Sequence, residues 1–554
     1  MIAPVDELRR APGIQFISLS LTLCLGACDH FASLGTLPPK DAQAAPGANE
    51  ESADGSVMSN TGDAAVPTTS IDECGPGNAA GLQGATLAAA RAGGSVAADA
   101  RILYPYDSTL FPARIAAPLL MWTGPSTDAI YLRARAAGLV YEGCVLPSGD
   151  HELAIPSTLW FEAQRAAQRN GDPLALDLEL TTLMGGTASG PLRVSLTLSA
   201  DAFSGVLYYM SYGSVLAGPI NLAAVMRLPL GGAPEPLLSP QGGCAGCHSV
   251  SANGTALIAS ITGLGNWYDD PGAAQRDPAP KGSNVMGGEF AAIDPTGTFY
   301  LAPAHPPLFG PRTMGASPQL TATLFDLASG APISDTGIPD AATTPAFSPD
   351  GKWLAFNDGS AGGHTLALMA FSGAQRQASS YRVIASDSAL YPAWPTFRPG
   401  SEQVVFALGA SASFGADGAL LSPGLGPPGP NSDLYSAELD GSGSALLFRA
   451  MGFLSPQDAD AERTYLPFAA EDLHQNYDPN ILPTRAGAHD WLFFDSVRHY
   501  GNRGVVRGLW CAALDTRPTK GTDPSHPPFY LPGQEDGAAS LRPIAARGDA
   551  DLGR

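Results

Sequence analysis

The stretch FSPDGKWLAFN, residues 347–357, decides the fold, because it is one of four related segments in the second half of the chain. The others are VSANGTALIAS (250–260), IDPTGTFYLAP (293–303) and FRPGSEQVVFA (397–407), the last with one extra residue. Their second residues lie 43, 54 and 50 positions apart. Each segment is a tight turn followed by a strand pattern, and repeats of about 40–50 residues are typical of β-propeller blades.

Strand–turn–strand patterns lie between these segments and predict the outer hairpins of the blades. They are AVMRLPLGGAPEPLL, ATLFDLASGAPI and DLYSAELDGSGSALLF. A late unit, NILPTRAGAHDWLFFDS followed by GLWCAALD, is a degenerate fifth copy. We therefore expect a propeller of five to seven blades over residues 221–535, followed by a flexible tail at 536–554.

The preceding region, residues 99–220, predicts a separate β-sandwich. Apolar and polar residues alternate in LALDLELTTL and LRVSLTLSA, the period of a half-buried strand. One helix is expected, opening near Ser157 or Thr158 and ending at Asn170-Gly171. Trp122 and Trp160 are expected in the core. The predicted fold class is all-β, a sandwich followed by a propeller.

The stretch PAFSPDGKWLAF resembles the repeat of the TolB-like β-propeller family. The whole chain resembles a group of extracytoplasmic lipoproteins abundant in myxobacteria, in which a tether, a sandwich opening with a YPYD run, a CxxCH motif and a propeller follow in order. The matching stretches here include ILYPYDSTLFP, YYMSYGSVLAG and CAGCHSVSANGT, within about residues 101–535. The resemblance implies a fold and a location; no activity comes with it.

The first residues predict export. Arg9 and Arg10 precede the apolar run 14–27, the layout of a secretory signal. The run ends in LGAC, which resembles the bacterial lipobox, and the resemblance implies that residues 1–27 are removed and that Cys28 carries lipid. We expect a lipid-anchored protein of the bacterial cell envelope, with the inner or outer membrane left open. Residues 28–98 are rich in small and polar residues and are expected to form a disordered tether.

The motif CAGCH at 244–248 predicts a covalent haem c. Cys244 and Cys247 have the spacing that lets two thiols reach the two vinyl groups of one porphyrin, and His248 follows as the proximal axial ligand. Export agrees with this, because bacterial c-haem is attached outside the cytoplasmic membrane. Three alternatives stay open: a structural disulfide, a redox dithiol, and another metal.

A sixth iron ligand, if there is one, is expected from the loop after the motif. Met286 is the first candidate, since methionine is a common soft ligand, and Met314 and His305 are alternatives. A five-coordinate site open to a small molecule is the other prediction.

The remaining chemistry is sparse. The formal net charge of −22 and the absence of a basic cluster argue against nucleic-acid binding. There is no G-x-S-x-G, P-loop or zinc-protease motif, so a classical enzyme is not expected. Cys74, Cys144 and Cys511 remain, and one pair of them can bridge: Cys74 with Cys144 is the first choice, and buried free thiols are the alternative.

Five other histidines are scattered along the propeller: His364, His474, His489, His499 and His526. The polar stretch DSVRHYGNR either lines the propeller mouth or closes the last blade. The expected function is electron transfer or redox sensing through a haem, with an unknown partner. The alternative is a binding or scaffold propeller, with Cys244–Cys247 as a disulfide.

Overall fold

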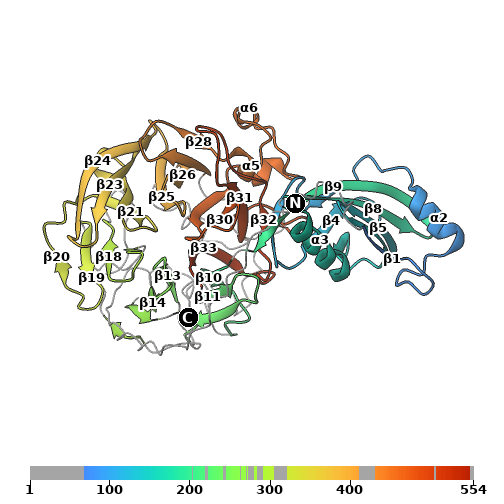
Figure 1. Cartoon of the computed structure of the whole chain (residues 1–554), viewed down its shortest axis with the longest axis horizontal. Coiled ribbons are helices and arrows are strands. Elements are labelled where there is room, and N and C mark those ends of the chain that lie inside the picture. Colours follow the sequence, from blue (N-terminus) through green and yellow to red (C-terminus); the bar gives the residue numbers. More distant parts are fainter. Residues whose placement is uncertain are drawn as a thin grey trace, which may run out of the picture.

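The computed structural model describes residues 68–171, 173–202, 204–218, 223–240, 245–261, 264–269, 271, 280–283, 291–304, 321–410, 431–504 and 507–548. Within these ranges the chain forms two bodies, a ring of small sheets and a more elongated body of longer strands beside it (Figure 1). No helix in the described part of the chain is long and apolar enough to cross a membrane.

The ring is a β-propeller made of six four-stranded sheets, counted over the described residues. We number its blades 1 to 6 in chain order and give the strands from the innermost outward. They are β33 (Ala539–Ala546), β10 (Val206–Tyr212), β11 (Ala223–Pro229) and β12 (Glu235–Leu238) in blade 1; β13 (Ala245–Val250), β14 (Ala256–Ile261), β15 (Leu264–Asp269) and β16 (Gly282–Ser283) in blade 2; β17 (Ala292–Ile293), β18 (Phe299–Ala302), β19 (Thr323–Asp326) and β20 (Pro332–Ile333) in blade 3; β21 (Ala342–Phe347), β22 (Trp353–Asp358), β23 (Thr365–Ser372) and β24 (Gln377–Ser386) in blade 4; β25 (Tyr391–Phe397), β26 (Gln403–Gly409), β27 (Ser432–Glu438) and β28 (Ser444–Leu446) in blade 5; and β29 (Asn476–Ile481), β30 (His489–Ser496), β31 (Gly508–Asp515) and β32 (Phe529–Tyr530) in blade 6.

The four repeated segments form the turn between the first and second strands of blades 2 to 5. In blade 4 the Ser348 hydroxyl accepts from the backbone N–H of Trp353, and Gly351 has φ +70°, a conformation that glycine adopts without strain. Asn253 and Gly254 build the same turn in blade 2. The degenerate copy at 480–496 supplies β30 of blade 6, as the sequence predicted.

The ring closes by pairing the two ends of the propeller sequence. Strand β33 runs antiparallel to β10 and becomes the innermost strand of blade 1. The predicted boundaries were therefore wrong at both ends: β10 lies inside the expected sandwich range, and β33 lies inside the expected flexible tail. Alternation alone did not reveal this, because a strand has the same period in a sandwich and in a blade.

The second body is the β-sandwich, with a six-stranded and a three-stranded sheet that share one hydrophobic cluster with blade 6. Its strands are, in sheet order, β1 (Thr69–Glu73), β6 (Leu139–Val145), β5 (Ala129–Ala136), β8 (Leu174–Met184), β9 (Thr187–Ala202) and β3 (Leu110–Ala113), then β2 (Arg101–Tyr104), β4 (Leu119–Thr123) and β7 (Glu152–Ala154). The helices within the described residues are α2 (Gly84–Ala92), α3 (Ser157–Asn170), η3 (Gly359–Ala361), α5 (Phe448–Met451), α6 (Pro456–Asp460) and α7 (Ala469–Asp472).

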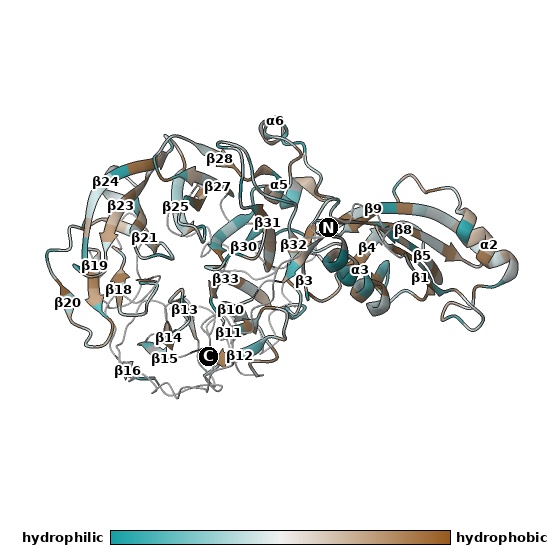
Figure 2. Cartoon of the chain, in the orientation of Figure 1, coloured by the Kyte–Doolittle hydropathy of each residue, from teal (hydrophilic) through white to brown (hydrophobic). Residues whose placement is uncertain are grey.

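Helix α3 confirms the helix predicted from the sequence. It is mostly hydrophilic (teal in Figure 2) but buries Leu159, Trp160 and Ala163. The Trp160 Nε1–H donates to the carbonyl oxygen of Ile115 at 2.9 Å, which satisfies the polar atom of a buried ring. Trp122, 1% exposed, is also in the core, as expected.

Part of the predicted tether belongs to the sandwich. Strand β1 pairs with β6 in parallel register, and helix α2 follows it. A disulfide joins Cys74 to Cys144 and confirms the expected pair, while Cys511 is free and buried. A covalent bond and sheet pairing hold this segment, although its composition is poor in core residues. The rest of the predicted tether, residues 28–67, lies outside the described residues.

Aromatic residues join the sandwich to blade 6. Tyr106 stacks on Trp510 at 5.9 Å between ring centroids, and Phe111 stacks on Phe529 at 5.0 Å. The Arg503 guanidinium forms a two-pronged ion pair with the Glu152 carboxylate of the sandwich. The stretch DSVRHYGNR, residues 495–503, thus lies at the junction of the two bodies and at the last blade.

Candidate functional site

The innermost strands of blades 1, 2, 4, 5 and 6 share a β-bulge that places unusual residues around the propeller axis. At each bulge a non-glycine residue has positive φ, between +43° and +55°. These residues are Cys247, Thr344, Trp394, Asp478 and Arg542 in blades 2, 4, 5, 6 and 1. Such a conformation is uncommon outside glycine, and strain of this kind collects at functional positions.

The residue after the bulge position is proline in four blades and differs in the other two. Proline stands there in four blades, as Pro345, Pro395, Pro479 and Pro543. Proline suits a bulge because it has no N–H to give to the strand ladder. Blade 3 has Ala291 at this place and blade 2 has His248. His248, Pro345 and Pro395 each lie three residues before the second residue of their repeat segment, so the sequence repeat and the bulges give the same alignment.

A cavity of about 140 Å³ lies among the innermost strands of all six blades. Four of the bulge residues line it: Thr344, Trp394, Asp478 and Arg542. The Arg542 guanidinium carbon lies 4.6 Å from the Trp394 ring centroid, a cation–π contact. The volume accommodates a few water molecules or one small polar group.

Buried charges are paired around this cavity. Asp495, fully buried, accepts from the backbone N–H of Arg542 and from the Arg507 side chain. Arg507 Nη2 also lies 3.9 Å from the Asp478 carboxylate. Pairing is what makes such burial affordable, since an isolated buried charge is very costly.

Cys247 and His248 lie next to this axis on β13. Cys247 is 1% exposed and disulfide-bonded, with its partner outside the described residues. Its backbone N–H donates to Met210 Sδ at 3.3 Å. His248 is fully buried, and neither ring nitrogen makes a hydrogen bond of good geometry among the described residues, although the Tyr208 backbone lies close enough to raise the pKa of the ring slightly against burial. Burial, together with the charge of Arg542, lowers the pKa of His248 to about 3, so the imidazole is neutral at pH 7.

The other predicted site residues lie outside the described part of the chain. These are Cys244 of the motif, Cys28 of the lipid anchor, the ligand candidate Met286 and its alternatives His305 and Met314. The described residues thus bring together two members of the expected haem site. They also place Met210 beside the motif, a methionine that the sequence did not single out because it is 37 residues from Cys247 in the chain.

The expected scatter of the propeller histidines was wrong for two of them. His489 and His526 lie on either side of Asp515 at one end of blade 6. Their spacing along the sequence matches no metal motif. Strands β30 and β31 and the loop after β31 bring them together. The other three pair locally: His474 with Asp433, His499 with Asp472, and His364 with the Leu390 carbonyl oxygen.

Comparison with known proteins gives no assignment by sequence. No family model matches the chain, and no curated protein matches it. Backbone comparison finds TolB from Acinetobacter baumannii, with 12% identity, a TM-score of 0.36, and coverage of 68% of this chain and 80% of that one. A putative TolB from Agrobacterium tumefaciens has 17% identity, a TM-score of 0.26, and coverage of 44% and 90%.

Hydrazine synthase from Kuenenia stuttgartiensis is a further match, with 13% identity, a TM-score of 0.29, and coverage of 49% of this chain and 62% of that one. At these identities and TM-scores, the likenesses say nothing about the chemistry of this chain.

Proposed function

We propose that this chain is an exported, lipid-anchored protein of the cell envelope whose propeller carries a haem c for electron transfer or redox sensing. Cys244 and Cys247 would hold the porphyrin as thioethers, and His248 would be the axial ligand. The proposal rests on the full burial of the His248 side chain at a position where four other blades have proline. Export and lipidation rest on the sequence of residues 1–28 alone.

His248 stands at the ligand position of the motif, but its ring is 0% exposed, so the entry of blade 2 would have to open for a porphyrin to reach it. A buried imidazole usually has hydrogen bonds. Without them, its desolvation destabilises the folded state and nothing offsets that penalty. At the same place four other blades use proline, which needs no partner. The His248 ring is also neutral, so a nitrogen lone pair is available to a metal. We infer that the histidine stands in blade 2 because something binds it.

Cys247 sets a condition on haem attachment. Each thioether forms when a thiol S–H adds across a vinyl group, so both cysteines must be reduced first, and Cys247 is disulfide-bonded in this structure. When bound, the haem would supply an iron that cycles between ferrous and ferric states. The chain's own contribution would be burial of His248 away from water and a fixed positive charge nearby, on Arg542.

Expression in a bacterium with c-haem maturation tests this proposal. We expect a haem-stained band on a denaturing gel, with its colour lost in Cys244→Ser and Cys247→Ser but kept in Cys511→Ser. Cys511 is a matched control because it is a buried cysteine outside the motif. A colourless wild-type band, with a Cys244–Cys247 bridge found by peptide mass mapping, would overturn the haem.

Two further variants test the finer parts. If Met286 is the distal ligand, Met286→Leu changes the visible spectrum of the haem protein, and an unchanged spectrum removes it. If Cys28 carries lipid, Cys28→Ala moves the protein from the membrane fraction to the soluble fraction. Retention of that variant in the membrane would contradict the anchor.

A second candidate is a binding propeller with no haem, and the disulfide at Cys247 favours it. In this function the disulfide would fix the entry of blade 2, and the axial cavity lined by Arg542, Trp394 and Asp478 would receive a polar group of a partner. Mass mapping decides between the two, since a cysteine in a disulfide cannot also be a thioether.

A further inference from the structure

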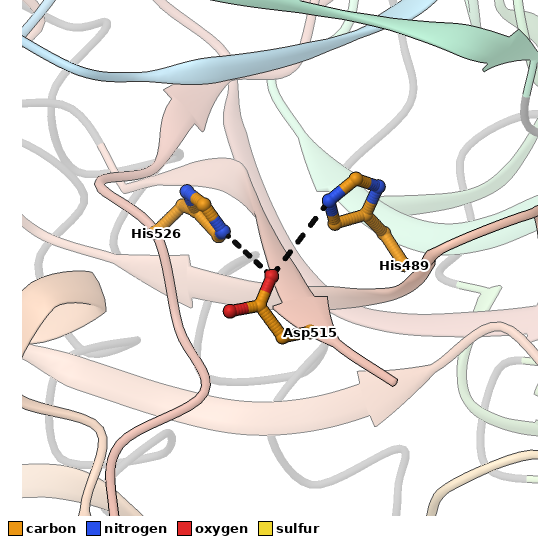
Figure 3. Close-up of side chains that lie close together, drawn as sticks. All are labelled: His489, Asp515 and His526. Carbon is orange, nitrogen blue, oxygen red and sulfur yellow. Dashed lines mark hydrogen bonds and ion pairs between the residues drawn. The ribbon is translucent and has the colours of Figure 1, made fainter. Parts of the chain in front are cut away.

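The side chains of His489, Asp515 and His526 converge at one end of blade 6, far along the chain from the CAGCH motif (Figure 3). Asp515 Oδ1 lies 3.0 Å from His526 Nε2 and 3.7 Å from His489 Nε2. The three atoms that face one another lie within 4.8 Å. The group therefore offers two imidazole nitrogens and one carboxylate oxygen to a common point.

The backbone holds the three residues in place without help from an ion. His489 and Asp515 are directly opposed in the antiparallel pair of β30 and β31. The loop that follows β31 folds back, so that the His526 backbone N–H donates to the Ala513 carbonyl oxygen at 3.0 Å. The Asp515 backbone N–H donates to Pro524 O at 2.9 Å, which fixes the same loop from the other side.

The dimensions suit a first-row transition metal. Such ions bind histidine nitrogen and carboxylate oxygen at about 2.0–2.2 Å, which puts neighbouring ligand atoms about 3.3–3.6 Å apart in tetrahedral geometry. The two distances to Asp515 Oδ1 bracket that spacing. Two histidines and one carboxylate form a recurrent ligand set for divalent zinc and iron.

The exposure of the three side chains is graded. His489 is 5% exposed, His526 is 28% exposed and Asp515 is 54% exposed. The inner side of the group is therefore closed by protein, while the side of the carboxylate faces solvent. Three protein ligands on one side leave a fourth position for water or another small ligand.

We propose that His489, Asp515 and His526 bind a divalent transition-metal ion, with one coordination position open to solvent. The site is independent of the haem, because it shares no residue with the CAGCH motif. The competing explanation is a hydrogen-bonded His–Asp–His cluster that needs no ion, and metal binding itself separates the two.

The test uses the full chain, purified in reducing buffer and stripped with a chelator, with Zn²⁺ and Co²⁺ as probes. We expect the wild type to bind one Zn²⁺ per chain. His526→Ala and Asp515→Asn should each lower the affinity for that ion about tenfold or more. Co²⁺ should give visible absorption bands in the wild type that both variants lack. Asp515→Asn keeps the size of the side chain, so it stays informative if His526→Ala fails to fold.

His364→Ala is the matched control. His364 lies in the same propeller and bonds only to a backbone carbonyl oxygen, so the variant should bind Zn²⁺ like the wild type. The proposal is overturned if the stripped wild type takes up no Zn²⁺, or if His526→Ala and Asp515→Asn bind it as tightly as His364→Ala does. Cys247→Ser, measured in parallel, shows whether any uptake comes from the CAGCH motif instead.

Discussion

His248 in blade 2 and Pro345 in blade 4 occupy the same position, directly after the positive-φ residue at the bulge of an innermost strand. The bulge opens the ladder in both blades, so the backbone does not need a hydrogen-bond donor there. A histidine at this place is therefore not required by the fold. Proline at this position satisfies the propeller backbone, so the imidazole of His248 is available for a role other than folding.

His248→Pro in the haem-free protein is expected to fold, with a free energy of unfolding within about 1 kcal/mol of the wild type, because proline already fits this bulge in four blades. Leu257→Pro is the comparison, since Leu257 lies in the middle of β14 and pairs with Val250 and Tyr268. That variant should lose about 3 kcal/mol or more. Urea denaturation followed by circular dichroism measures both, and equal losses would contradict the equivalence of the two positions.

Deletion of residues 539–554 is expected to give an aggregating protein, because it removes β33 and leaves the edge of β10 unpaired. Three of the lost side chains, Leu541, Ala545 and Ala546, are at most 5% exposed. Deletion of 549–554 alone is the control and should leave a soluble monomer. Size-exclusion chromatography distinguishes the two, and a monomeric, cooperatively unfolding protein without β33 would show that the ring does not depend on this closure.

The double variant Cys74→Ala/Cys144→Ala should lower the free energy of unfolding of the sandwich by about 4 kcal/mol, the loop-entropy value for a bridge of this span. The two cysteines are 70 residues apart in the chain. Cys511→Ala, which removes a buried thiol without breaking a bridge, should cost about 1 kcal/mol. Urea denaturation under oxidising conditions is the measurement, and a double variant as stable as Cys511→Ala would refute the stabilising role.

His474 should stabilise the propeller more at low pH than at high pH. The hydrogen bond to Asp433 raises the pKa of His474 against the opposing effect of burial. A group whose pKa is raised in the folded state stabilises below its unfolded pKa of about 6.5, and that stabilisation disappears as the pH rises through the folded value.

The measurement compares His474→Gln with the wild type in urea. The loss should be about 1.5–3 kcal/mol at pH 5.5, typical of a hydrogen bond to a charged group, and smaller at pH 8.5. A His474→Gln loss that is equal at the two pH values would contradict the ion pair.

Much of the propeller was predictable from local signals. The turns with Asn253-Gly254 and Asp350-Gly351 were recognisable because such turns require residues that accept positive φ. Helix α3 was recognisable from the residues that begin and end it, whereas Cys74–Cys144 was only one of the pairings that three remaining cysteines allowed. The blade number was not predictable, since blade 1 contains none of the four clear repeats and takes its strands from both ends of the propeller sequence.

One candidate site was recognisable in the sequence, and the other was not. CAGCH is visible because its chemistry needs fixed spacing along the chain, so five adjacent residues suffice. His489, Asp515 and His526 carry no such spacing, and strand pairing together with a returning loop brings them to one point. The sequence by itself determined the repeat, the turns and the haem motif, because each depends on neighbouring residues. Only the tertiary structure decided the ring closure, the burial of His248 and the His–Asp–His cluster, because each depends on contacts between residues distant in the chain.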